Sequence, residues 1–137
     1  MNLVSQPSAQ PSTPVLGYGP MDAVHADFDR MVAQARACSD VEFPHCLQAV
    51  IGHLREHFEQ EDRWMRETDF PPGDCHQDEH AAVLTSADEV LALPDPAQRL
   101  SVGRAFVAEL ANWFPGHADY LDSALAAWMC KRAFGGK

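Results

Sequence analysis

Histidine and carboxylate side chains stand one helical turn apart at several places in this sequence, in stretches with the apolar periodicity of amphipathic helices. Residues four apart in a helix point to the same side, so His57 and Glu61 share a face. Val50, Leu54 and Met65 lie on that face too. Burying a histidine and a carboxylate among apolar side chains is costly unless something pairs with them. The pair therefore indicates a metal ion in the protein core.

The same arrangement recurs downstream. His76 and His80 are four residues apart, and His117 and Asp122 are five apart. His25 stands alone in an earlier amphipathic stretch. A single pair is weak evidence, because such spacings often arise by chance. Four successive segments that each carry such side chains on a core face are much stronger evidence, and they predict a two-metal site inside a helical bundle.

Four helical stretches are expected to position these residues. We predict helices over about 21–38, from Asp40 to about 67, over about 75–92 and over about 96–133, the last with a kink or short break at Pro115-Gly116. Asp40, Asp74 and Asp95 are the expected caps of the second, third and fourth helices. No stretch has the pattern of a strand. Short connections predict an all-α protein, an up-down-up-down antiparallel four-helix bundle with an N-terminal arm and a short C-terminal helical extension.

The bulk properties restrict the class of protein. The chain has 137 residues and a net charge of −10, which argues against nucleic acid or an anionic membrane as the main partner. No apolar run approaches the roughly 20 residues of a membrane span. No signal peptide is evident, and the four cysteines form no C-x-x-C pair, so we expect a cytoplasmic protein with reduced thiols. Residues 1–20, rich in proline, serine and glutamine, are predicted to be a flexible arm, and residues 21–134 the bundle.

Two other kinds of metal site deserve comparison. The stretches HLREH at 53–57 and HQDEH at 76–80 fit the H-x-x-E-H signature of inverted zinc peptidases, with the glutamate of either stretch as general base. That interpretation leaves Glu61 and the last pair unexplained, in a chain that is small for a peptidase. A ferritin-type di-iron site needs two Glu-x-x-His pairs and two further glutamates. Only one such pair, Glu42 and His45, is present.

In order and spacing, the ligand-type residues resemble those of the hemerythrin family, specifically the bacterial hemerythrins. The stretches HFEQEDRWM and NWFPGHADYLD resemble that family too, and the resemblance covers about residues 20–130. It implies an up-down-up-down bundle, of which myohemerythrin is an example. It also implies two iron ions per chain. Their ligands would be His25, His57, Glu61, His76, His80, His117 and Asp122.

The resemblance further implies how the ligands are shared. Glu61 and Asp122 would bridge the two irons together with an oxide or hydroxide. The three later histidines would complete one iron, whereas His25 and His57 would leave a position open on the other for O2 or a small anion such as azide. The implied function is reversible O2 binding for carriage, storage or sensing, and not catalysis. A di-iron redox enzyme acting on peroxide or nitric oxide is the alternative, and the sequence neither separates the two nor names a protein that receives the oxygen.

Neighbouring side chains are expected to enclose the site and exclude water. The predicted wall residues are Phe28, Leu54, Phe58, Trp113 and Leu121. Three further residues of metal-binding type are not assigned as ligands. His53 has no matching partner, His45 lies near a loop, and Cys75 points away from the face that carries the neighbouring histidine.

Overall fold

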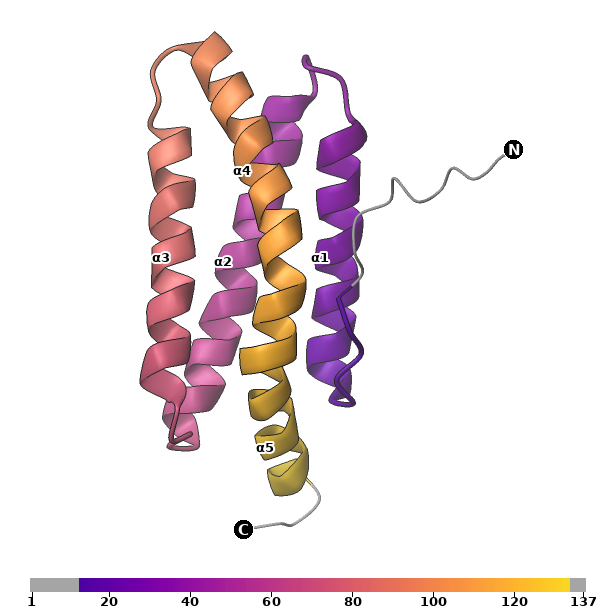
Figure 1. The fold of residues 1–137 in the computed structure, drawn as a ribbon, viewed down its shortest axis with the longest axis vertical. Helices are drawn as coiled ribbons and strands as arrows, with labels where there is room; N and C mark the ends of the chain where they lie inside the picture. Colours follow the sequence, from indigo (N-terminus) through magenta and orange to yellow (C-terminus); the bar gives the residue numbers. More distant parts are fainter. Residues whose placement is uncertain (1–12, 134–137) are drawn as a thin grey trace, which may run out of the picture.

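The computed structural model describes residues 13–133, which fold into a bundle of helices (Figure 1). The helices are α1 (Gly19–Ala37), α2 (Phe43–Glu67), α3 (Gly73–Leu91), α4 (Pro96–His117), a π-helical turn (Ala118–Asp122) and α5 (Ser123–Ala133). Helices α1 to α4 alternate in direction, and α5 continues the line of α4 beyond the π-helical turn. No strand occurs between residues 13 and 133. The predicted fold class is therefore confirmed, and each helix lies within a few residues of its predicted range.

The predicted N-terminal arm, residues 1–20, lies largely outside the described part of the chain. Its last residues lie along α1 and are held there by side chains of that helix. The backbone N–H and hydroxyl of Thr13 donate to Asp29 at 2.9 and 2.7 Å, and the backbone N–H of Gly17 donates to Asp22 at 3.0 Å. Gly17 has φ +90°, a left-handed conformation that glycine adopts without strain, where the chain turns into α1. The end of the arm is thus anchored to the bundle.

Two of the predicted helix caps are wrong. The residue before α2 is Glu42 and the residue before α3 is Pro72, and neither makes a side-chain capping hydrogen bond. Asp40 instead accepts hydrogen bonds from the guanidinium of Arg104 on α4, at 2.8 and 3.1 Å. The carboxylate that we assigned to capping therefore forms an ion pair with a distant helix instead. Asp74 lies inside the first turn of α3, where its charge still suits the helix dipole.

The fourth helix begins as predicted and ends differently. Asp95 caps it by accepting from the N–H of Ala97 at 3.3 Å. The break that was one alternative at Pro115-Gly116 is absent, because α4 continues through both residues to His117. The irregularity comes one turn later, as the π-helical turn. A widened turn, and not a break, connects α4 to α5.

The hydrophobic core is divided into two clusters. The larger draws side chains from all four long helices, among them Phe28, Phe58 and Phe114. The smaller consists of Met21, Met65, Phe70, Leu125 and Ala126. Along α2, Glu61 stands between Phe58 and Met65, and along α1, His25 stands between Met21 and Phe28. A layer of polar side chains therefore separates the two clusters. No helix in the described range is long and apolar enough to cross a membrane.

Candidate metal centre

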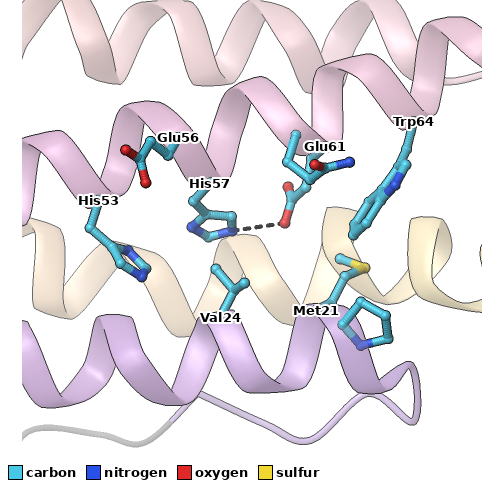
Figure 2. Close-up of a pocket in the computed structure, with 9 residues that line it drawn as sticks. Met21, Val24, His53, Glu56, His57, Glu61 and Trp64 are labelled. Atoms are coloured by element: carbon cyan, nitrogen blue, oxygen red, sulfur yellow. Dashed lines mark hydrogen bonds and ion pairs between the residues drawn. The ribbon is translucent and has the colours of Figure 1, made fainter.

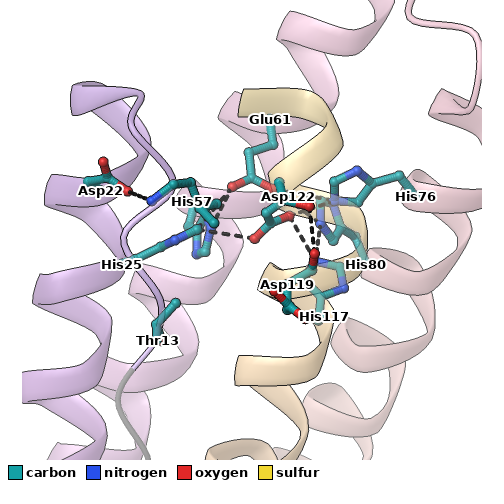
Figure 3. Close-up of polar contacts among 12 residues, drawn as sticks. Thr13, Asp22, His25, His57, Glu61, His76, His80, His117, Asp119 and Asp122 are labelled. Carbon is teal, nitrogen blue, oxygen red and sulfur yellow. Dashed lines mark hydrogen bonds and ion pairs between the residues drawn. The ribbon is translucent and has the colours of Figure 1, made fainter. Parts of the chain in front are cut away.

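All seven predicted ligand side chains meet in this polar layer, and every one is buried (Figure 3). They come from α1 (His25), α2 (His57 and Glu61), α3 (His76 and His80), α4 (His117) and the π-helical turn (Asp122). The most accessible of them is His57, at 5 %. The bundle therefore gathers, from segments up to 97 positions apart (122 − 25), the residues that the sequence pattern selected.

The π-helical turn explains why the last pair is spaced by five residues. In a regular α-helix, residues five apart point in different directions, since each residue adds about 100°. In the π-helical turn the backbone N–H of Ser123 bonds to the carbonyl of Ala118, five residues earlier. The extra residue in the turn brings Asp122 onto the side of His117, where Oδ1 lies 3.2 Å from Nε2. A spacing of five thus serves the same purpose as the spacing of four elsewhere.

Glu61 lies between two sets of histidines. Its Oε2 atom faces the first set, at 2.7 Å from Nε2 of His57 and 3.6 Å from Nε2 of His25. Its Oε1 atom faces the second set, at 3.4 Å from Nε2 of His80 and 3.6 Å from Nε2 of His76. Each oxygen of this carboxylate therefore points to a different group of imidazoles.

Asp122 divides its oxygens in the same way. Its Oδ2 atom lies 3.1 Å from Nε2 of His25. Its Oδ1 atom lies 2.8 Å from Nε2 of His76 and 3.2 Å from Nε2 of His117. Figure 3 shows both carboxylates between His25 and His57 on one side and the other three histidines on the opposite side.

The donor atoms form two compact groups, within each of which they lie no more than 4.8 Å apart. The two-histidine group is His25, His57, Glu61 and Asp122. The three-histidine group is His76, His80, His117, Glu61 and Asp122. Because the two carboxylates belong to both groups, the geometry suits a pair of adjacent cations held by shared bridges.

The two carboxylates remain ionised although they are buried. Burial by itself raises the pKa of Glu61, but the nearby His57 and the other imidazoles hold it well below its usual range. The pKa of Asp122 is likewise raised by burial and lowered far more by His117, His25 and His76. Two negative charges in a dry interior require positive charge beside them.

Two of the histidines can supply this positive charge by binding a proton. Burial alone lowers the pKa of His25, yet the neighbouring Asp122 and Glu61 raise it to about 9. Burial also lowers the pKa of His80, and Asp62 and Glu61 raise it to about 9. The cluster therefore attracts cations, whether these are protons on imidazole or metal ions.

Unpaired atoms provide a direct test of whether metal ions fit. Within the described chain, several buried atoms of the cluster have no hydrogen-bond partner, although other polar atoms lie close to them. They include His25 Nε2, His76 Nε2, Glu61 Oε1 and both carboxylate oxygens of Asp122. Buried polar atoms rarely stay unpaired in folded proteins. Imidazole nitrogen and carboxylate oxygen are ligands for first-row transition metals, so the donor set fits two such cations.

Comparison with known proteins agrees with this geometry. Residues 16–129 match the family described as the hemerythrin HHE cation binding domain. The chain belongs to the hemerythrin family. It is also similar to a bacteriohemerythrin of Ralstonia nicotianae, with 36 % identity over 117 residues that cover 85 % of each chain. No solved structure is significantly similar to the chain.

The peptidase interpretation is not supported in this hemerythrin domain. His53 belongs to neither donor group, so the HLREH stretch supplies only one candidate ligand, His57. The HQDEH stretch supplies two, but its glutamate, Glu79, bonds to the imidazole of His117. A glutamate held in this way is not placed as a free general base.

Two carboxylates that the sequence interpretation missed support histidines of the three-histidine group. Nδ1 of His80 donates to Oδ1 of Asp62 at 2.8 Å, and Nδ1 of His117 donates to Oε1 of Glu79 at 2.7 Å. Because Nδ1 is occupied by the carboxylate, Nε2 is the ring nitrogen that faces the interior of the cluster and can bind a metal ion. The sequence offered one indication of these two carboxylates, namely that Asp62 follows Glu61 and Glu79 precedes His80. Several other acidic residues are equally close in sequence, so that signal alone does not select these two.

Two aromatic rings lie flat against the same two histidines. Phe58 stacks on His80 with ring centroids 3.8 Å apart and planes at 5°. Trp113 stacks on His117 at 4.5 Å and 29°. Both were predicted wall residues, and both exclude water from the three-histidine group.

The wall of the two-histidine group includes a residue that was not predicted. Phe114 makes edge contacts with His25 and His57, with ring centroids 5.2 and 5.5 Å apart. Its place on the inner face of α4 follows from periodicity, but its contact with helices α1 and α2 depends on how the helices pack. Of the other predicted wall residues, Phe28 and Leu54 are fully buried. Leu121 is only partly buried, and its role stays a prediction.

A cavity of about 200 Å³ reaches the two-histidine group from between α1 and α2 (Figure 2). It is lined by Pro20, Met21, Val24, His53, Glu56, His57, Gln60, Glu61 and Trp64. His57 and Glu61 are the candidate ligands on its wall, and none of the three later histidines lines it. Figure 2 shows His53, His57 and Trp64 projecting from α2 toward Met21 and Val24 of α1.

The residues that were not assigned as ligands stay outside both donor groups. His53 is partly buried and lines the cavity. Its pKa is lowered mainly by burial and then by the charge of the nearby His57. His45 and Cys75 are exposed, as predicted from their positions near a loop and on an outer helix face.

Proposed function

We propose that this protein binds O2 reversibly at a non-heme di-iron centre. The observation that carries the proposal is the unequal division of donors around a cavity. Five side chains form one group and four form the other, with two shared, and the cavity opens on the smaller group. A site that holds one metal firmly and leaves room beside the other suits a small ligand.

In this proposal all seven clustered side chains are iron ligands. Glu61 and Asp122 would hold both irons, since each directs one oxygen to each group, and the family resemblance implies an oxide or hydroxide between the irons. The three-histidine group would then supply three imidazoles and two carboxylate oxygens, and the oxide or hydroxide would be the sixth ligand. The two-histidine group supplies one fewer and keeps one position open.

The protein surroundings favour O2 over larger ligands. Two iron ions, when bound, supply the two electrons that allow O2 to be held and later released. Phe28 and Phe114 contact imidazoles of the two-histidine group and exclude water from its inner side. The cavity, at about 200 Å³, is smaller than the roughly 300–1,000 Å³ of sites for larger organic ligands.

We also propose that the bundle, residues 21–134, is the functional unit, that it acts in the cytoplasm, and that it carries, stores or senses oxygen. Support comes from the family match over residues 16–129 and from the relative named bacteriohemerythrin. The acidic charge of −10 disfavours nucleic acid as a partner.

One observation favours the alternative, a di-iron redox enzyme acting on peroxide or nitric oxide. His53 lines the cavity and has a lowered pKa, so its imidazole is neutral near pH 7. A neutral imidazole can give or take a proton at a molecule bound in the cavity. Reversible carriage needs no such proton exchange, whereas reduction of peroxide does.

Optical spectra recorded through cycles of reduction, air and argon separate the two functions. We expect an absorption band that appears with air and disappears under argon. Rapid, irreversible conversion to the oxidised form would contradict carriage and support redox turnover. Metal analysis of the same sample is the control: one zinc and no iron per chain, in cells grown with iron, would refute the di-iron proposal altogether.

A further inference from the structure

Two of the four cysteines lie together, far from the metal centre. Cys38 follows the last residue of α1, and Cys46 lies in the first turn of α2. Both are partly buried and pack against the larger hydrophobic cluster. Cys38 is 13 residues beyond His25 along α1 (38 − 25), which corresponds to about 20 Å of helix. The pair therefore belongs to the opposite end of the bundle, where α1 and α2 are joined (Figure 1).

The two cysteines are neighbours that line the same cavity. Both are free, and the pKa of the Cys46 thiol is raised, first by burial and then by its interaction with the Cys38 thiol. Neighbouring groups hold Cys38 in place. Its Sγ donates to the carbonyl of Ala35 at 3.3 Å, and its own carbonyl accepts from the guanidinium of Arg104 at 3.0 Å. The Cys38 thiol is thus held at the connection between α1 and α2.

A second cavity gives small molecules access to this pair. It measures about 460 Å³, is open to solvent, and is lined by Gln34, Ala37, Cys38, Glu42, His45 and Cys46. The other cysteines have different surroundings. Cys75 is exposed on α3, and Cys130 on α5 donates to the carbonyl of Gly17 at 3.4 Å. Oxidation that needs two neighbouring thiols is therefore expected at only one place in the described chain.

We propose that Cys38 and Cys46 form a dithiol that hydrogen peroxide converts into an intramolecular disulfide. The S–S bond forms as the O–O bond of peroxide breaks. Each thiol proton leaves on one of the two oxygen atoms, so one peroxide and two thiols give one disulfide and two water molecules. The cysteines lose two electrons and peroxide gains them. A small dithiol reductant reverses the reaction by thiol–disulfide exchange.

The disulfide would tie the end of α1 to the start of α2. Closing a loop of about nine residues restricts the unfolded chain, so the oxidised protein should melt about 5 °C higher than the reduced protein. This modification is independent of the proposed O2 chemistry, because neither cysteine belongs to the donor groups.

Mass spectrometry of the full-length protein tests the proposal. Reduced protein is treated with hydrogen peroxide or, in a parallel sample, with the thiol-specific oxidant diamide, and the remaining thiols are then alkylated. Trypsin leaves both cysteines in one peptide, residues 37–55. A second protease that cuts after Glu42 separates them unless a disulfide joins the halves.

We expect the halves to remain joined until dithiothreitol is added, with Cys75 and Cys130 alkylated. Cys38→Ser and Cys46→Ser should abolish the joined species and the rise in melting temperature, whereas Cys75→Ser should change neither. Alkylation of both Cys38 and Cys46 after oxidation, or their conversion to sulfinic acid without a joined species, would overturn the proposal. Disulfide-linked dimers through Cys75 as the main product would overturn it too.

Discussion

The two-histidine and three-histidine groups share Glu61 and Asp122, and their surroundings differ. In the three-histidine group, His80 and His117 each bond through Nδ1 to a carboxylate, at 2.8 and 2.7 Å, and each carries a stacked aromatic ring. In the two-histidine group, the Nδ1 atoms of His25 and His57 have no hydrogen-bond partner within the described residues. The cavity opens on this second group.

The different surroundings suit the two groups to different roles, one to firm metal binding and the other to binding of a small ligand. Hydrogen bonds to Nδ1 fix the tautomer and orientation of a ligand imidazole and increase its basicity. Stacked rings restrict its motion further. The three-histidine group therefore has the properties of a firm anchor, although the Nδ1 atom of His76 also lacks a partner. The two-histidine group has the looser surroundings and the access that a binding position needs.

Removing a shared carboxylate should have the largest effect, because it affects both groups at once. Glu61→Ala or Asp122→Ala removes one oxygen from each group and leaves buried imidazoles without their charge partner. We expect iron to fall from about two per chain to less than about one. His45→Ala, which alters an exposed histidine, is the control and should keep full iron content. Full occupancy in both carboxylate variants would show that these residues are not bridges.

Removing the metal should loosen the layer that joins the two groups. A chelator-treated sample should melt about 10 °C lower than the loaded protein, since the binding free energy is lost from the folded state. The metal-free form should also become less stable as pH rises. The pKa values of His25 and His80 are raised to about 9, so their contribution is complete below about pH 6.5 and is lost as pH approaches 9.

Low pH should also destabilise the metal-free protein, through the two carboxylates. The pKa values of Glu61 and Asp122 are lowered, so their contribution is present above about pH 4 and is lost at lower pH. Thermal melts of metal-free and loaded protein across this range measure both effects. Equal melting temperatures for the two forms at every pH would contradict the coupling of metal and fold.

Variants of the supporting carboxylates, Asp62 and Glu79, test whether the three-histidine group binds metal more firmly. Asp62→Asn and Glu79→Gln keep the shape of each side chain but remove its charge. Metal affinity at the three-histidine group should fall about 10- to 100-fold, measured by competition with a chelator of known affinity. Asp78→Asn, at an exposed carboxylate on α3, is the matched control. If all three variants bind metal equally well, the carboxylates do not make this group the firmer one.

Filling the cavity tests access to the two-histidine group, and we expect a smaller effect than for the variants above. Val24→Phe should fill part of the cavity while leaving every candidate ligand in place. Azide affinity of the oxidised protein should fall about tenfold, or about 1.4 kcal/mol, with iron content unchanged. Val102→Phe places the same bulk on α4, away from the centre, and should leave azide affinity as it is. A larger loss with Val102→Phe would place the binding position elsewhere.

The sequence predicted the parts of this molecule that depend on periodicity. Ligand-type residues at one-turn spacing on core faces selected all the side chains that the bundle gathers. His53 and Cys75, which were not assigned as ligands, lie outside the donor groups. The four helices and their alternating directions followed from apolar stripes and short connections. Each of these features is local, or repeats along a single helix.

Features that depend on contacts between helices were not predicted. Asp62 and Glu79 are acidic residues on partly exposed helix faces, and only the packing of α2, α3 and α4 brings them to an imidazole. Asp40 was assigned to a cap, but it pairs with Arg104, 64 positions away. The π-helical turn at Ala118–Asp122 was not predicted. A kink or break was expected at Pro115-Gly116 instead, since proline predicts disruption of a helix and not the form or place that it takes.

The most direct test of the account is a crystal structure of the iron-loaded protein with azide bound. We expect two irons bridged by Glu61 and Asp122, with azide on the iron that His25 and His57 hold, at the end of the cavity between α1 and α2. Azide on the iron held by His76, His80 and His117 would contradict the assignment of the open position.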